Sequence, residues 1–254
     1  MKLGLKIWST NDYYIKEAQE LFRKGIFDYI ELFAVPQSEN FIKLWSSVEI
    51  PFILHAPHSL AGFNPAQSSK ESKNFENLIT LEEYRKALDP EYIIFHPGLD
   101  GTIKESIRQF RILKEKFPKI HKISLIENKP VKGLNGENCI GTTPKELDYL
   151  QKNTGMNLCL DIGHATCAAN SIKANIWNFL RQFIELNPLI FHLSDGIINS
   201  EVDEHLNYGK GNFDLEKIIS LLPEDPIISI ETNKTPDKKL NTFINDAMLL
   251  RNLR

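Results

Sequence analysis

Short apolar runs rich in β-branched residues alternate with longer amphipathic stretches along the whole chain of 254 residues. Runs of about four to eight such residues are typical of buried strands, and the stretches between them have the apolar spacing of helices. We expect strands at Leu3–Trp8, Tyr29–Val35, Phe52–His55, Tyr92–His96, Ile123–Glu127, Asn157–Asp161, Leu189–Ser194 and Ile227–Glu231.

The amphipathic stretches predict helices that separate these strands. We expect helices at Asp12–Arg23, Ile103–Lys116, Thr143–Gln151, Ile172–Leu186, Leu215–Leu222 and Leu240–Leu253. About eight strand–helix repeats in roughly 250 residues are typical of a (β/α)8 barrel. An open, doubly wound sheet is the alternative, but no Gly-x-Gly-x-x-Gly motif follows the first strand. The sequence therefore predicts an α/β protein, a single TIM barrel domain over residues 1–254.

Composition excludes several classes of protein. The net charge of −3 argues against a large basic face for nucleic acid. No apolar run approaches the roughly 18 residues of a membrane span, so we expect no membrane association. Cys139, Cys159 and Cys167 are too few for a disulfide framework and favour a reducing, cytoplasmic location.

Six of the apolar runs end in a side chain of the kind that binds metal ions. These residues are His55, His96, Glu127, Asp161, His192 and Glu231. Because strand side chains alternate between two faces, each shares a face with the residue two positions earlier. For the first five, that residue is Ile53, Ile94, Leu125, Cys159 and Ile190. If these fill the barrel interior, the polar side chains form a ring at its C-terminal mouth, where barrel enzymes carry out their chemistry.

Three further candidates follow the strands in predicted loops: His164, Asp203 and His205. Nine histidine, aspartate and glutamate side chains at one end of a barrel are costly unless cations compensate them. Imidazole together with carboxylate suits Zn2+, Mn2+ or Fe2+ better than Ca2+ or Mg2+. The pattern therefore predicts a metal centre.

These residues and their neighbours resemble the endonuclease IV family of zinc-dependent apurinic/apyrimidinic endonucleases, which are xylose isomerase-like barrels. The segments that carry the resemblance are His55-Ala56-Pro57, Phe95-His96-Pro97-Gly98, Ile126-Glu127-Asn128, Leu160-Asp161-Ile162-Gly163-His164-Ala165, His192-Leu193-Ser194-Asp195, Asp203-Glu204-His205 with Gly209-x-Gly211, and Glu231-Thr232. They occur in the family's order over nearly the whole chain.

The resemblance implies up to three zinc ions. His55 and His96 would hold the first, and Glu127 would bridge it to the second. Asp161, His192 and Glu231 would complete the second site, and His164, Asp203 and His205 would hold the third. It also implies cleavage of a phosphoester, with abasic DNA as the leading substrate and a smaller phosphoester as the variant, by a metal-bound hydroxide. Glu127 and Glu231 are the predicted catalytic residues.

The sequence departs from the nuclease pattern where that pattern concerns DNA. His58-Ser59 stands where the nucleases place an aromatic and an apolar wedge. The first strand lacks the family's histidine, and the loop after the second strand has no counterpart of its arginine. Trp8 and Phe33 could supply a wedge, but we interpret both as core residues.

Two other functions remain open. A sugar or sugar-phosphate isomerase or epimerase of the same superfamily would need one metal, held by Glu127, Asp161, His192 and Glu231. That function leaves the other five candidate ligands without a purpose. The second alternative is a barrel without enzymatic activity that binds only metal or a partner protein. We expect no obligate protein partner.

Overall fold

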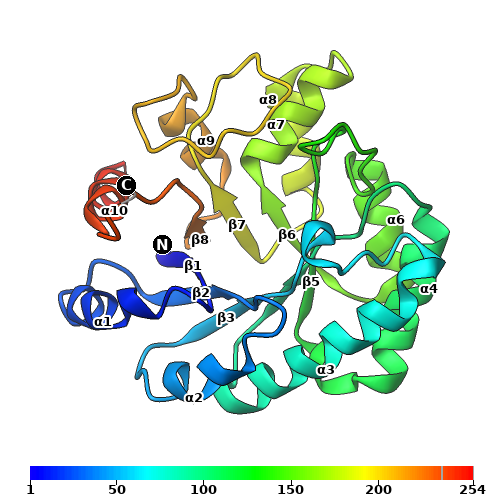
Figure 1. The fold of residues 1–254 in the computed structure, drawn as a ribbon. Coiled ribbons are helices and arrows are strands. Elements are labelled where there is room, and N and C mark those ends of the chain that lie inside the picture. Colours follow the sequence, from blue (N-terminus) through cyan, green and yellow to red (C-terminus); the bar gives the residue numbers. More distant parts are fainter. Residues whose placement is uncertain (236, 254) are drawn as a thin grey trace.

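The computed structural model describes residues 1–235 and 237–253, with the side chain of Leu60 left out. Eight parallel strands close into a barrel in which each pairs with its neighbours in chain order, and β1 pairs with β8 (Figure 1). The strands are β1 (Lys2–Trp8), β2 (Tyr29–Phe33), β3 (Phe52–His55), β4 (Ile93–Phe95), β5 (Ser124–Glu127), β6 (Asn157–Asp161), β7 (Ile190–Leu193) and β8 (Ile227–Ile230). The predicted (β/α)8 barrel is confirmed.

Helices surround the barrel and connect its strands (Figure 1). They are α1 (Ile15–Arg23), α2 (Ile42–Trp45), α3 (Glu71–Leu88), α4 (Ile103–Lys116), α5 (Pro118–Lys122), α6 (Pro144–Thr154), α7 (Ile162–Ser171), α8 (Ile176–Ile184), α9 (Leu215–Leu221) and α10 (Asn241–Asn252). The large core cluster lies between these helices and the outer face of the strands. Among the described residues, no helix combines the length and apolar character needed to cross a membrane.

The helices α2, α3, α5 and α7 were not predicted from the sequence, and α8 differs in its start. The long helix α3 is absent from the sequence prediction, because Asn74 and Asn77 lie on its buried side while Phe75 and Ile79 are exposed. Because polar residues lie on the buried side and apolar residues on the exposed side, the sequence of this helix shows no apolar repeat with a period of 3.6 residues. The predicted helix Ile172–Leu186 begins too early, since α8 starts at Ile176 and the separate helix α7 precedes it.

The interior of the barrel is a separate buried cluster below the mouth. It contains Tyr29, Ile53, Ile94, Leu125, Cys159 and Ile190. The strand phase deduced from the sequence is thereby confirmed for all five residues it placed there. The ring of Tyr29 lies where a Cβ at Gly4 would be, 2.3 Å from that position, so a glycine on β1 is required to admit the tyrosine. Burying each large side chain here stabilises the fold by about 1.5–3 kcal/mol.

Candidate metal centre

All nine predicted ligands lie together at the C-terminal end of the barrel. His55, Glu127, Asp161 and His192 belong to the ends of β3, β5, β6 and β7, and His96 and Glu231 directly follow β4 and β8. Their nitrogen and oxygen atoms fall into groups whose members lie within 4.8 Å of one another: His55 with His96 and Glu127; Asp161 with His192 and Glu231; His164 with Asp203 and His205; and Glu127 with Asp161 and His164. The first three groups match the ligand sets that the resemblance implies, and the fourth joins them through Glu127.

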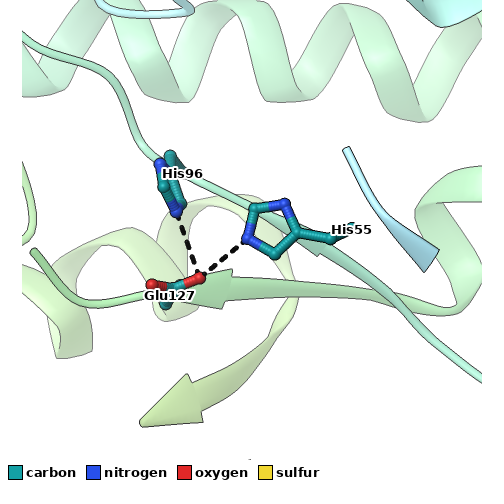
Figure 2. Close-up of side chains that lie close together, drawn as sticks. All are labelled: His55, His96 and Glu127. Carbon is teal, nitrogen blue, oxygen red and sulfur yellow. Dashed lines mark hydrogen bonds and ion pairs between the residues drawn. The ribbon is translucent and has the colours of Figure 1, made fainter. Parts of the chain in front are cut away.

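Glu127 is the centre of the first group (Figure 2). Its Oε2 atom lies 3.1 Å from Nε2 of His55 and 3.1 Å from Nε2 of His96. Nδ1 of His55 lies 2.7 Å from the carbonyl oxygen of Ala56. When Nδ1–H donates to that carbonyl, the lone pair of Nε2 faces the interior of the group, as a metal ligand requires.

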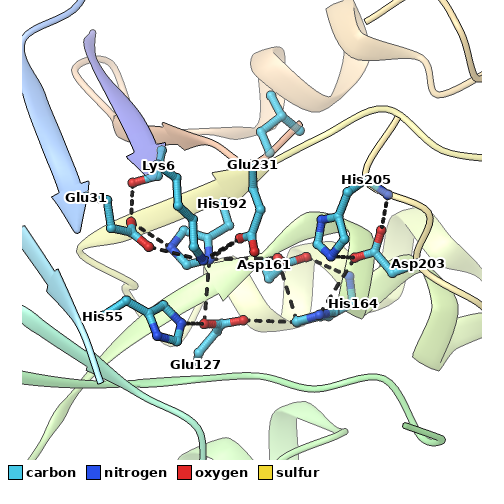
Figure 3. Close-up of polar contacts among 12 residues, drawn as sticks. Lys6, Glu31, His55, Glu127, Asp161, His164, His192, Asp203, His205 and Glu231 are labelled. Carbon is cyan, nitrogen blue, oxygen red and sulfur yellow. Dashed lines mark hydrogen bonds and ion pairs between the residues drawn. The ribbon is translucent and has the colours of Figure 1, made fainter. Parts of the chain in front are cut away.

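His192 is the centre of the second group (Figure 3). Its Nδ1 atom lies 2.9 Å from Oε2 of Glu231, 3.6 Å from Oε2 of Glu127 and 3.8 Å from Oδ2 of Asp161. Three carboxylates thus converge on one ring nitrogen. Oδ1 of Asp161 accepts a hydrogen bond from the backbone N–H of His164 and so caps helix α7, which leaves Oδ2 for the group.

The third group does not lie wholly in loops, as the sequence analysis expected. His164 belongs to the first turn of α7, while Asp203 and His205 lie in the loop after β7. Oδ2 of Asp203 is 3.7 Å from Nε2 of His164 and 3.8 Å from Nε2 of His205. A Cβ at Gly163 would lie 2.6 Å from the same oxygen, so the close approach of Asp203 to α7 requires this glycine.

The loop that carries Asp203 and His205 is braced by the backbone. The Asp195 carboxylate accepts hydrogen bonds from the N–H groups of Gly209, Gly211 and Phe213, which explains the Gly209-x-Gly211 spacing as a turn around a carboxylate. His205 adopts a φ of +48°, a conformation unusual for a side chain of its size. Its carbonyl oxygen accepts a hydrogen bond from the backbone N–H of Asn233. The third group is therefore built on a fixed loop.

The residues present fit divalent cations. Among the described residues, five buried atoms of the groups make no hydrogen bond of good geometry: Oε1 of Glu127, Nδ1 of His192, Oδ2 of Asp203, Nδ1 of His205 and Oε2 of Glu231. Four of them have only ionisable neighbours at ion-pair distance. Burial, together with the neighbouring carboxylates Asp203, Glu231 and Glu127, raises the pKa of Asp161 to about 6. Orphaned acceptors and mutually repelling carboxylates are the features that a bound cation would relieve.

Two charged residues beneath the ring were missed by the sequence analysis. Glu31 on β2 is fully buried, and its Oε2 lies 2.9 Å from Nε2 of His192. Lys6 on β1 lies 3.1 Å from Oε1 of Glu31 and 2.8 Å from Oε2 of Glu231 (Figure 3). Burial alone would raise the pKa of Glu31, but His192 and Lys6 lower it to about 2. Glu31 therefore stays ionised and can accept the Nε2–H proton of His192, directing Nδ1 toward the second group.

A second lysine reaches the mouth itself. Nζ of Lys129, just after β5, lies 3.3 Å from Nε2 of His164. A lysine two positions after a predicted ligand at the end of a strand is the signal that could have found it. An ammonium group at this place can contact an anionic substrate beside the third group.

Trp8 and Phe33, both interpreted as core residues from the sequence, have different environments. Phe33 is buried, as expected, but Trp8 is 55% exposed, so its assignment to the core is wrong. Trp8 ends β1, and it shares the interior face of that strand with Lys6. More than half of its surface is therefore accessible to solvent at the mouth.

Comparison with known proteins agrees with this architecture. The chain matches, over residues 15–252, the sequence model of a family described as xylose isomerase-like TIM barrel. The chain belongs to this family. A probable endonuclease 4 of Thermoplasma volcanium is 28% identical over 183 residues, which cover 68% of this chain. The chain spans 62% of the length of that curated relative.

Two solved structures match this chain over 100% of its length. A D-tagatose 3-epimerase-like protein has a TM-score of 0.71 at 24% identity, with 97% of its own chain covered. Endonuclease IV from Thermus thermophilus has a TM-score of 0.70 at 20% identity, with 98% covered. At these identities the likeness shows the fold alone. Proteins named as an endonuclease and as an epimerase-like protein share this fold, so the fold does not distinguish the two activities.

Proposed function

We propose that this protein is a divalent-metal-dependent phosphodiesterase that cleaves a nucleic acid backbone, with abasic DNA as the leading substrate. The observation that carries the proposal is the third group. His164, Asp203 and His205 lie within 4.8 Å of one another beside the ring, and a one-metal isomerase has no use for them. Imidazole and carboxylate donors favour zinc, with manganese and iron as alternatives.

Cations at these three groups would supply Lewis-acid stabilisation of the phosphate oxygens and activation of water. The protein holds the groups in place. Glu127 contacts the first group through Oε2 and His164 through Oε1, so it would join the first group to Asp161 and His164. Glu231 would be shared between the second group and Lys6. Lys129 would bind a non-bridging phosphate oxygen near His164. No side chain has to act as a nucleophile.

The charge balance would allow the metal-loaded mouth to bind anions. Glu127, Asp161, Asp203 and Glu231 together carry a charge of −4, and the buried pair of Lys6 and Glu31 adds zero. Three divalent cations would change the charge of these groups to about +2, and Lys129 adds one more positive charge at the mouth. A protein with a net charge of −3 can in this way attract a phosphodiester to one place.

An isomerase or epimerase acting on a sugar is the second candidate. One observation favours it: Asp161, His192 and Glu231 form a group without the loop after β7, and Oε2 of Glu127 lies 3.6 Å from Nδ1 of His192 as a fourth candidate ligand. In that case Glu127 and Glu231 would carry protons to and from carbon. The two candidates differ in what the third group contributes.

The test replaces both loop ligands. We expect Asp203→Ala combined with His205→Ala to remove one bound metal, keep the fold, and reduce cleavage of an abasic-site duplex by orders of magnitude. The assays are metal content per chain and cleavage of the duplex beside a panel of aldoses and ketoses. Cleavage by the double variant at the parent rate would refute the proposal, and sugar turnover by the parent would establish the second candidate.

A further inference from the structure

The strand ends around the mouth carry two kinds of side chain on their inner face. Strands β3 to β8 present or lead into the six ring ligands. Strands β1 and β2, which pair at Trp8 and Phe33, present aromatic rings at the same level of the fold. Lys6 and Glu31, two positions earlier, point into the barrel, so period-two alternation places both aromatic rings on the inner face as well.

The aromatic side chains form a continuous row that leads to the first metal group. The ring centroids of Trp8 and Phe33 are 5.9 Å apart, and those of Phe33 and His58 are 5.0 Å apart. His58 stacks on His96 at 5.8 Å with an interplanar angle of 13°. The row ends in solvent at Trp8.

We propose that Trp8 is a stacking platform for a nucleobase of the substrate, a proposal that rests on the proposed phosphodiesterase function. The row of rings runs from His96 in the first metal group to Trp8, and a nucleotide whose phosphate binds at the metal groups would place its base, one sugar away, along this row. A planar base can cover the exposed tryptophan face and bury apolar surface there, whereas a puckered sugar covers less of it. Every base offers such a face, so the platform would not select a sequence.

This arrangement differs from a wedge that opens a duplex. Trp8 extends the interior face of β1, and its only ring contact among the described residues is the tilted Phe33, which is itself buried. A net charge of −3 argues against a large basic face that would hold a long duplex against such a wedge. The platform suits a single nucleotide, a strand end or an extruded base.

The experiment compares two ligands that share a ribose 5-phosphate and differ at C1, which carries adenine in one and a hydroxyl group in the other. Adenosine 5′-monophosphate and ribose 5-phosphate are titrated by calorimetry into the zinc-loaded parent protein. The same titrations are made with Trp8→Leu, with Trp8→Phe, and with Trp177→Phe as the control. Trp177 lies on α8, on the outside of the barrel. Tryptophan fluorescence is followed in parallel, and circular dichroism checks the fold of each variant.

We expect the parent to bind the nucleotide about tenfold more tightly than the sugar phosphate, since stacking on one aromatic ring is worth about 1–3 kcal/mol. Trp8→Leu should abolish this preference, Trp8→Phe should restore part of it, and Trp177→Phe should retain both the preference and the quenching of fluorescence. Equal binding of the two ligands by the parent, no binding of either, or a preference that survives in Trp8→Leu would each overturn the proposal.

Failure of the proposed function is distinguishable from failure of the platform. If the zinc-loaded parent prefers the nucleotide through Trp8 but cleaves no phosphodiester, the stacking site stands and the phosphodiesterase proposal fails. If it cleaves abasic DNA with equal affinity for the two ligands, the function stands and Trp8 has no part in binding the base.

Discussion

The two sectors of the barrel mouth differ in chemistry although one strand geometry builds both. The sector from β3 to β8 converges imidazoles and carboxylates at separations near 3–4 Å, whereas the sector of β1 and β2 presents Trp8 and Phe33. Below the mouth the two sectors are joined, because Glu31 on β2 contacts His192 on β7 and Lys6 on β1 contacts Glu231. Strands without a ligand at their end can therefore still hold the ligands of other strands in place.

Glu127→Gln should have the largest effect, because it removes the charge shared by the first and second groups. We expect metal content to fall and cleavage of the abasic duplex to decrease by about 10²–10³-fold or more. Metal analysis and single-turnover cleavage measure the two changes, with Glu115→Gln on the exposed side of α4 as the control. Full activity at unchanged metal content would show that the ligand sector does not depend on Glu127.

Glu31→Gln tests whether the aromatic sector supports the ligand sector from below. An amide can still contact His192, but it removes the negative charge that directs the Nε2–H proton and leaves Lys6 with one carboxylate instead of two. We expect the affinity of the second group for zinc to fall by about tenfold to a hundredfold. Calorimetric titration of the metal-free protein with zinc measures this affinity. An unchanged affinity would show that β1 and β2 do not support the metal groups.

Asp161→Asn separates charge from helix capping within the ligand sector. Asparagine preserves the cap of α7, so the change isolates the charge. The pKa of about 6 in the folded protein exceeds the ordinary value of 3.8. Ionisation of this carboxyl group therefore destabilises the metal-free fold. The destabilisation is absent below about pH 4, grows between about pH 4 and 6, and is complete above that range.

We expect Asp161→Asn to stabilise the metal-free protein by about 1–3 kcal/mol at pH 8 and to leave it unchanged near pH 3. The increase in melting temperature on adding zinc should shrink in the same variant. Thermal melts across this pH range, with and without metal, provide the measurement. A stabilisation of the same size at every pH would mean that charge repulsion is not its cause.

Phe33→Leu should have the smallest effect, and it tests whether the aromatic sector can change without loss of metal. The side chain is buried and apolar, so a substitution of similar volume should cost about 1 kcal/mol of stability and lower the melting temperature by about 2–4 °C. Metal content should not change, because Phe33 belongs to none of the four groups. A loss of bound metal in this variant would show that metal binding depends on the aromatic sector as well as on the ligand sector.

The strand phase could be predicted from the sequence because period-two alternation is rigid. It places His55, Glu127 and His192 at one mouth and Cys159 in the interior, where the folded chain has them. Whether the nine side chains bind metal stays a prediction. Their convergence is a property of the described structure.

The remaining features depend on interactions that the local sequence does not specify. Glu31 and Lys6 lie below the strand ends, so inspection of the ends alone missed them; a charged residue inside an apolar strand, on its interior phase, is the signal that identifies them. Helix α7 was missed because its residues are small and buried on all sides, which leaves no amphipathic period. The exposure of Trp8 depends on what other segments place above it.

The apolar layer beneath the ring has a kinetic consequence. Tyr29 and its neighbours in the interior cluster are closely packed below the metal groups, and so an ion can enter or leave only by the mouth. A substrate bound at the mouth would block the exit of every metal ion bound beneath it. Chelators should then remove metal quickly from the free protein and slowly from its complex with substrate. The fraction of sites that hold metal would therefore depend on the exit rate of the ions as well as on their affinity.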